Sequence, residues 1–149
     1  MRRSVYIEGF SHGNNPVPAA SVIDRWLMTG AVFGTDRFTG KVPEPLPEQC
    51  RLMFDNVGRI LAAAGGGFEH VLKMTFFLHP EVPRELINQH WTTHFPDPTS
   101  RPARHVIVSD RLPASMRMQC DLVALLDAAD APATGRAQAA TGMPMTSAA

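Results

Sequence analysis

The chain has 149 residues, of which 44% are hydrophobic and 19% charged, a composition typical of one globular domain. Fourteen basic residues balance fourteen acidic ones, which argues against a strongly electrostatic partner such as duplex nucleic acid or an anionic membrane. No apolar run approaches the roughly 18 residues of a membrane span, and none follows the basic N-terminus as in a secretory signal peptide. We therefore expect a cytoplasmic protein.

The N-terminal third predicts two strands. Residues 4–10 (SVYIEGF) form the first candidate, and residues 11–21 (SHGNNPVPAAS) are typical of a loop because they contain Gly, Asn and Pro. Residues 25–34 (RWLMTGAVFG) predict the second strand, bent at Gly30. The Thr39–Gly40 step and the prolines of residues 35–47 then favour turns.

Two helices and three further strands follow. Residues 47–64 carry apolar side chains at spacings of three and four, which predicts an amphipathic helix that the glycines of 65–67 end. Residues 70–78 predict a strand, and residues 80–96 a second helix that starts near Pro83 and ends before Pro96. The last two predicted strands are RHVIVSDRLP (104–113) and SMRMQCDLVALLD (115–127).

This order of elements predicts an α+β fold, a two-layer sandwich in which both helices cover one face of a mixed sheet. The strands are too apolar for the other face to remain in water, so we expect self-association. Residues 1–127 form one domain in this interpretation. Residues 128–149, rich in Ala, Thr, Gly and Pro, are expected to be a disordered low-complexity tail.

Several segments taken together resemble the Rid family, the reactive intermediate deaminases also called endoribonuclease L-PSP or translation inhibitors. The segments are GTDRFTGKVP, QCRLMFDNVGRILAAAGG, HVLKMTFFL, INQHWTTHF and RPARHVIVSDRLPASMRMQCDLVAL, and the resemblance covers residues 12–126. It implies a chorismate-mutase-like fold with a six-stranded sheet. It also implies a homotrimer with clefts between subunits.

Arg104 is the first candidate site residue. From the strand alone, it would be a surface arginine whose side chain extends over the strand end. The resemblance instead implies that Arg104 binds a substrate carboxylate, for which the planar and permanently charged guanidinium is well suited.

The resemblance also places a glutamate on the last strand, where it positions the attacking water, but this chain has Gln119 there. Glutamine can orient a water molecule but cannot accept its proton. Asp121 lies two residues further, on the same strand face, and could supply the missing carboxylate. The alternative is that Asp121 is a polar edge residue or the partner of a nearby cation.

Four further residues occupy positions that the resemblance makes relevant. Thr29 stands where the family has a serine hydroxyl, Asn88 matches a family asparagine, and Val106 would contribute a backbone N–H to the cleft. The aromatic hydroxyl of the family's N-terminal loop is missing here, and His12 in that loop could replace the lost acid–base group. His12 and Asn88 could equally be solvent-facing residues without a role.

Neither a cofactor nor a metal site is expected, because the six histidines are scattered and lack the spacing of a ligand set. The first functional hypothesis is a hydrolytic deaminase of a small carboxylate-bearing imine or enamine, with an aminomuconate-like compound as a variant substrate. The second is a trimeric protein that binds such a metabolite without catalysis, which Gln119 favours. The third, a ribonuclease or translation inhibitor, is disfavoured by the zero net charge.

Overall fold

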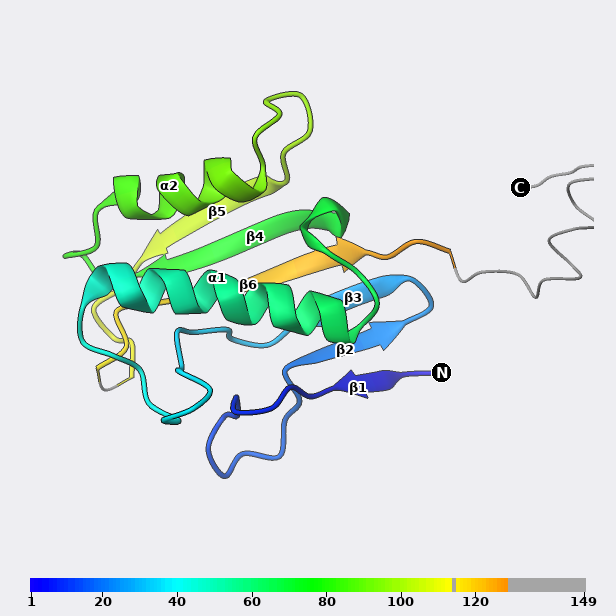
Figure 1. Ribbon diagram of the computed structural model, residues 1–149, viewed down its shortest axis with the longest axis horizontal. Coiled ribbons are helices and arrows are strands. Elements are labelled where there is room, and N and C mark those ends of the chain that lie inside the picture. The colour runs from blue at the N-terminus through cyan, green and yellow to red at the C-terminus, as the bar shows by residue number, and fades with distance from the viewer. Residues whose placement is uncertain (114, 129–149) are drawn as a thin grey trace, which may run out of the picture.

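A computed structural model of the chain describes residues 1–113 and 115–128, and Figure 1 shows its arrangement. The strands are β1 (Arg3–Val5), β2 (Ala20–Ile23), β3 (Trp26–Thr29), β4 (Val71–Leu78), β5 (Ala103–Val108) and β6 (Met118–Leu125). The helices are α1 (Leu46–Ala63) and α2 (Arg84–His94), with a short 3-10 turn at Phe68–His70.

The six strands form one mixed sheet in the order β1-β2-β3-β6-β4-β5. Neighbouring strands are antiparallel except for β4 and β5, which are parallel and are connected through α2. Both helices cover the same face of this sheet, with α1 across its middle and α2 along β4 and β5 (Figure 1). The predicted two-layer α+β sandwich is therefore confirmed.

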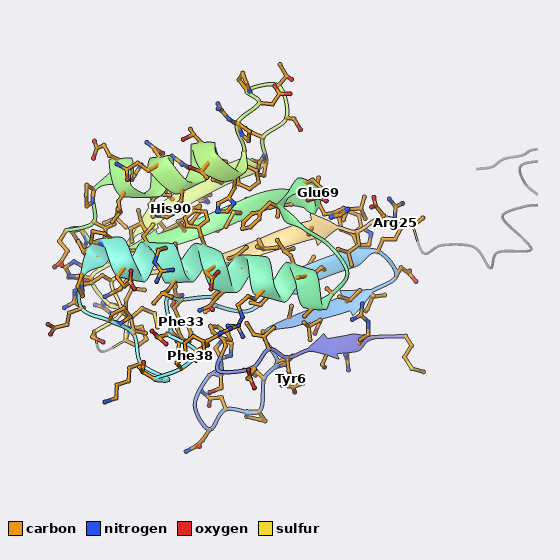
Figure 2. All side chains as sticks on the ribbon, viewed as in Figure 1. Tyr6, Arg25, Phe33, Phe38, Glu69 and His90 are labelled. Atoms are coloured by element: carbon orange, nitrogen blue, oxygen red, sulfur yellow. The ribbon has the colours of Figure 1, made fainter. Side chains whose placement is uncertain are left out.

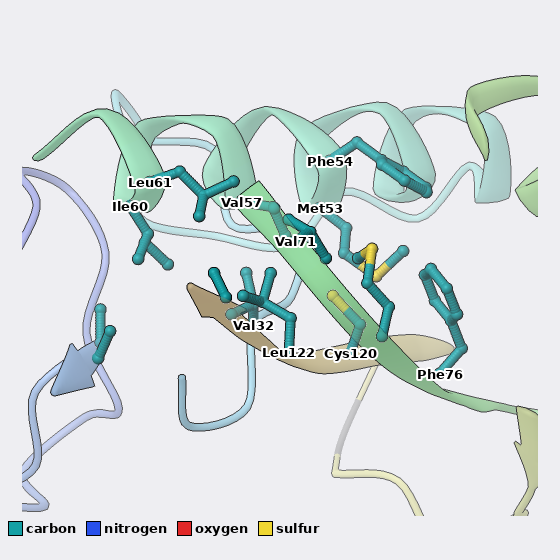
Figure 3. Packing of buried hydrophobic residues seen from close by; sticks show 14 of the residues in the cluster. Val32, Met53, Phe54, Val57, Ile60, Leu61, Val71, Phe76, Cys120 and Leu122 are labelled. Atoms are coloured by element: carbon teal, nitrogen blue, oxygen red, sulfur yellow. The ribbon is translucent and has the colours of Figure 1, made fainter. Parts of the chain in front are cut away.

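The core lies between α1 and the sheet, and Figure 3 shows side chains of the helix pointing onto β4 and β6. Met53, Val57 and Ile60 of α1 are fully buried, as the helical spacing predicts. The helix ends where Gly65 adopts a left-handed conformation (φ 87°) and the amides of Gly65 and Gly66 donate to the carbonyls of Ala62 and Leu61. This is the glycine-terminated end that the triple glycine predicts.

An aromatic stack joins α2 to α1, and Figure 2 shows His90 between the two helices. The His94 ring stacks on Phe68 at 3.9 Å between centroids and on Phe54 at 5.5 Å, while His90 stacks on Phe54 at 5.1 Å. Burial is the main cause that lowers the pKa of both histidines; the charge of Arg51 adds to the effect on His90, and His90 adds to the effect on His94.

The prediction for the N-terminal strands was wrong in two respects. The first strand covers Arg3–Val5 rather than residues 4–10. The segment 20–29 is a hairpin of β2 and β3, whereas we expected one strand over 25–34 preceded by a loop to residue 21. The turn of this hairpin is made by Asp24, a non-glycine residue with φ 54°, and Arg25, so no glycine signals it in the sequence.

The remaining elements agree with the predictions to within a few residues, except that β5 ends at Val108 and β6 begins at Met118. The predicted tail begins at residue 128, and residues 129–149 lie outside the described part of the chain. Within the described residues, no helix combines the length and the apolar composition that crossing a membrane requires.

The face of the sheet opposite the helices carries apolar side chains in contact with solvent. Trp26 and Met28 of β3 are 49% and 57% exposed, and Ile23, paired with Trp26, is 49% exposed. Ile107 of β5 and the half-buried Phe77 of β4 lie on the same face because paired residues point to the same side. Within residues 1–113 and 115–128, one copy of the chain thus leaves exposed the face that the sequence predicts to be buried.

Candidate functional site

Arg104 belongs to a small polar cluster between β5 and α2. Its Nη1 donates a 2.8 Å hydrogen bond to Oδ1 of Asn88, and its guanidinium carbon lies 5.0 Å from the ring centroid of Trp91. Asn88 and Trp91 are three apart on α2, so they share the helix face that meets β5. We call these three residues the Arg104 cluster.

The half-buried guanidinium of Arg104 forms no ion pair with an acidic side chain among the described residues. Desolvation lowers its pKa, and the nearby positive charge of Arg84 lowers it further. A guanidinium remains charged under such a shift, because its ordinary pKa lies far above neutral pH. Among the described residues, the Arg104 cluster is therefore a cationic site without an acidic counter-ion.

Gln119 and Asp121 lie on the other face of the sheet. They alternate along β6 with the buried Met118 and Cys120, and they pair across β4 with Phe77 and Thr75. Arg104 pairs with Met74, whose side chain is in the core. In one chain, Arg104 and Gln119 are consequently separated by the sheet itself.

Asp121 has its pKa raised by partial burial, against a smaller lowering effect from the charge of Lys73. It forms no ion pair among the described residues, and it does not line the cavity described next. Gln119 and Asp121 thus share a strand face, as predicted, but only Gln119 reaches the cavity described next.

A cavity of about 790 Å³ lies between the N-terminal loop, the segment after β3 and the start of β6. We call it the His12 cavity. Figure 2 shows Phe33, one of its walls, on the side of α1 where the N-terminal loop lies. The cavity brings together His12 and Gln119, which are far apart in sequence. Its lining residues include the apolar Phe10, Phe33, Val42, Pro113 and Met116 and the polar Ser11, His12, Asn15, Thr35 and Gln119.

The imidazole of His12 is held by contacts on several sides. Its Nε2 lies 2.8 Å from the carbonyl oxygen of Ala31, which can only accept, so Nε2 carries the proton. Phe10 and Phe33 contact the ring in edge-to-face geometry, at 5.4 and 5.6 Å between centroids. Nδ1 is left as a shielded acceptor without a hydrogen-bond partner among the described residues.

Two buried amides of α1 fasten the walls of the His12 cavity. Nδ2 of Asn56 donates to the carbonyls of Phe33 and Thr35 at 2.9 and 3.0 Å. Gln49 donates to the carbonyl of Ser115 at 3.1 Å and accepts from the amide of Arg117 at 3.0 Å, beside Met116. Both amides are 1% exposed.

Gln49 and Asn56 were missed by the sequence analysis. Their signal was present, since polar residues at 49 and 56 fall on the same helix face as the apolar Met53 and Ile60. Gly34 completes this fastening, because a Cβ at that position would lie 2.3 Å from the carbonyl oxygen of Gln49. The loop can approach α1 this closely only with glycine there.

Thr29 and Val106 lie outside the His12 cavity. The Thr29 hydroxyl accepts a 3.0 Å hydrogen bond from the Leu122 amide and so joins β3 to β6. Val106 is half-buried against the core, two residues after Arg104 and on the same face. The structure thus assembles Arg104 with Asn88 and Val106 on one face, and His12 with Gln119 in a cavity elsewhere.

The two cysteines are buried, and burial raises the pKa of the Cys50 thiol to about 12 and that of Cys120 further. Neither thiol is poised as a nucleophile, because the thiolate is the reactive form. Across residues 1–113 and 115–128, no group of three His, Cys, Asp or Glu side chains is arranged to hold a metal ion.

Comparison with known proteins gives matches over most of the chain. The family model of endoribonuclease L-PSP matches residues 12–126. A RutC family protein of Aquifex aeolicus is 27% identical over 110 residues, which cover 74% of this chain and 88% of the relative. The 2-iminobutanoate/2-iminopropanoate deaminase of Mus musculus is 30% identical over 111 residues, 74% of this chain and 81% of the relative.

Solved structures show the same fold. The crystal structure of E. coli TdcF with bound serine superposes with a TM-score of 0.74 at 21% identity, and the match covers 84% of this chain and 99% of TdcF. The match to the family model, the similarity in sequence and the shared six-stranded architecture agree with one another. The chain therefore belongs to the endoribonuclease L-PSP family, the family of the Rid proteins.

Proposed function

We propose that this protein is a hydrolytic deaminase that acts on a small carboxylate-bearing imine or enamine. The observation that carries the proposal is the half-buried guanidinium of Arg104, which Asn88 and Trp91 orient and which has no acidic partner in the part of the chain that the structure describes. Such a group binds a carboxylate through charge-assisted hydrogen bonds. The mouse relative is named for two imino acids, and TdcF was crystallised with serine; all three compounds carry a carboxylate.

The proposed site forms between two copies of the chain. Arg104 and Gln119 point away from opposite faces of one sheet, so a single small ligand cannot reach both in one copy. The apolar face that includes Trp26, Met28 and Ile107 supplies a surface for association, and we propose that three copies close around it. The Arg104 cluster of one copy would then face the His12 cavity of the next.

In this arrangement, four of the predicted site residues have roles that follow from their chemistry. Arg104 and the backbone at Val106 bind the carboxylate, and Asn88 orients Arg104. The Gln119 amide positions a water molecule for attack on the imine carbon, a reaction that positioning alone can accelerate. The attack forms a carbinolamine, the C–N bond then breaks, and ammonia and a carbonyl compound leave.

Two groups are candidates to take the proton from the water. Asp121 has a raised pKa but lies outside the cavity, and Nδ1 of His12 lies in its wall but is shielded. Either would need a local rearrangement to reach the water. Thr29 is proposed to act only on the position of β6, since its hydroxyl is bonded to Leu122.

A second candidate function is binding of the same metabolite without catalysis, because Gln119 cannot act as a base. The test is an assay of 2-iminopropanoate and related imines generated in situ, including those of leucine and phenylalanine, in which the release of ammonia or of the 2-oxo acid is compared with the spontaneous rate. The deaminase proposal expects an acceleration that disappears in Arg104→Ala. If the wild type gives no acceleration and only Gln119→Glu gains activity, the binding function stands instead. The ribonuclease alternative predicts RNA cleavage that survives rigorous purification.

A further inference from the structure

We propose that the substrate of this site is a 2-imino acid with a bulky, uncharged, apolar side chain, which the His12 cavity holds. The inference rests on the proposed function and specifies which carboxylate-bearing imine the protein takes. It is carried by the composition of the cavity wall and by where the polar groups of the site are.

Two of the three substituents of an imino acid can be assigned to Arg104 and Gln119. The central carbon carries a carboxylate, a nitrogen and a side chain. Arg104 of a neighbouring copy serves the carboxylate, and the Gln119 amide serves the reacting carbon and its water. The wall beyond Gln119 is what remains for the side chain.

That wall is predominantly apolar. Phe10, Phe33, Val42 and Met116 contribute to it, and its volume of about 790 Å³ far exceeds what a methyl or ethyl group requires. Sites of this size and lining are typical of ligands with a substantial apolar part. The His12 ring is nearly perpendicular to the rings of Phe10 and Phe33, which are tilted by 36° to each other, so the wall offers edges and faces against which a flat or branched side chain can pack.

The wall also carries almost no charge. Of the described residues that line the cavity, His12 is the only one with an ionisable side chain, and its Nε2 is already bonded to the Ala31 carbonyl. A second carboxylate on the substrate would enter this space without a fixed counter-charge, which is costly. The site therefore disfavours dicarboxylate intermediates such as an aminomuconate.

The experiment compares imines made in situ from alanine, leucine, phenylalanine and glutamate by an amino acid oxidase. We expect kcat/KM for the leucine and phenylalanine imines to exceed that for the alanine imine by about 10- to 100-fold, from the apolar surface that each side chain buries. The glutamate imine should be the poorest substrate. Equal or better turnover of the alanine or glutamate imine would overturn the inference while leaving the deaminase proposal intact.

A matched pair of variants tests whether the substrate side chain binds in the His12 cavity. Val42→Phe reduces the volume of the cavity and should lower the ratio of phenylalanine-imine to alanine-imine kcat/KM about tenfold. Ala62→Phe adds the same ring on the exposed face of α1 and should leave this ratio unchanged. Thermal unfolding of both variants verifies that they fold. An unchanged ratio in folded Val42→Phe would show that the side chain binds elsewhere.

Binding of stable 2-oxo acids separates ligand class from catalysis. Calorimetric titration should give phenylpyruvate a dissociation constant at least tenfold below that of pyruvate, with 2-oxoglutarate weakest. If this order holds without imine turnover, the deaminase proposal fails and the ligand class stands. If pyruvate or 2-oxoglutarate binds as tightly as phenylpyruvate, or if none of the three binds, the inference is wrong.

Discussion

The Arg104 cluster and the His12 cavity are held in place by different means. Regular elements support the Arg104 cluster, because the arginine is on β5 and its two partners are on α2. Loops form the cavity, and they are fastened to α1 by the side-chain amides of Gln49 and Asn56. The first region is cationic, and the second is almost uncharged.

This difference shows how the fold divides the requirements of the proposed chemistry. A charge that must bind a carboxylate is placed on the rigid edge of the sheet, where an aromatic ring and an amide limit its motion. A space that must accept a side chain is placed among loops, whose sequences can vary without disturbing the sheet. The two meet only if a second copy of the chain brings them together.

Loss of the Arg104 guanidinium should cause the largest change, a loss of activity. Arg104→Ala removes the charged group proposed to bind the carboxylate, and we expect kcat/KM for a 2-imino acid to fall by about 100-fold or more. Arg104→Lys should recover little, because an ammonium cannot bind a carboxylate in the same bidentate geometry. Activity of Arg104→Ala within a factor of two of wild type would remove the Arg104 cluster from the site.

Loss of a side-chain amide that fastens the loops to α1 should affect the wall of the His12 cavity. Asn56→Ala leaves the buried carbonyls of Phe33 and Thr35 without their side-chain donor, which should cost about 1–3 kcal/mol of unfolding free energy. Urea unfolding measures this cost, and Asp55→Ala, at the exposed neighbouring position, is the control. A cost below about 0.5 kcal/mol would show that the amide does not hold the wall.

Asn88→Ala should have a smaller effect, confined to the Arg104 cluster. The arginine keeps its charge and its contact with Trp91 but loses the acceptor that orients it. We expect KM to rise about 3- to 10-fold with little change in kcat, as for a residue that acts on binding. Gln89→Ala, on the exposed side of the same helix, is the matched control. A fall in kcat with an unchanged KM would contradict a role of Asn88 in positioning Arg104.

A change in the aromatic stack between α1 and α2 should have the smallest effect, a change in how stability depends on pH. The pKa values of His90 and His94 are lowered in the folded state, so folding disfavours their protonation. Their contribution to stability is complete above the ordinary histidine pKa of about 6.5 and is lost as the pH falls through the lowered values.

His94→Phe keeps the stack on Phe54 and Phe68 but removes one titrating group. The melting temperature should fall between pH 7.5 and pH 5 in both proteins. We expect the fall to be about 2 °C smaller in His94→Phe than in the wild type. Differential scanning calorimetry measures both. An identical pH dependence would show that His94 protonation is not linked to folding.

The sequence allowed the Arg104 side of this comparison to be predicted better than the cavity side. The periodic spacing of α1 and α2 and the apolar run of β5 are local patterns, and the helices, the sheet and the position of Arg104 follow from them. The hairpin of β2 and β3 was missed because its turn uses Asp24 and Arg25 instead of glycine.

The cavity depends on contacts between distant segments. His12 meets Ala31, and Gln49 meets Ser115, through hydrogen bonds that no local pattern encodes. The alternation of β6 predicted that Gln119 and Asp121 share a face, but not that only Gln119 reaches the cavity. Which residues line a loop-built cavity is decided by tertiary packing.

The most direct test of a site shared between copies is subunit complementation. Two variant chains are used: one carries Arg104→Ala, and the other carries both His12→Gln and Gln119→Leu. Each is first shown to lack activity when it is expressed alone. Equal mixing by co-expression should regenerate about one quarter of the wild-type sites, because both native halves then meet at random across an interface. Imine hydrolysis restored to about that level, in trimers identified by light scattering, is the predicted result. Mixed oligomers without any regained activity would contradict a site built from two copies of the chain.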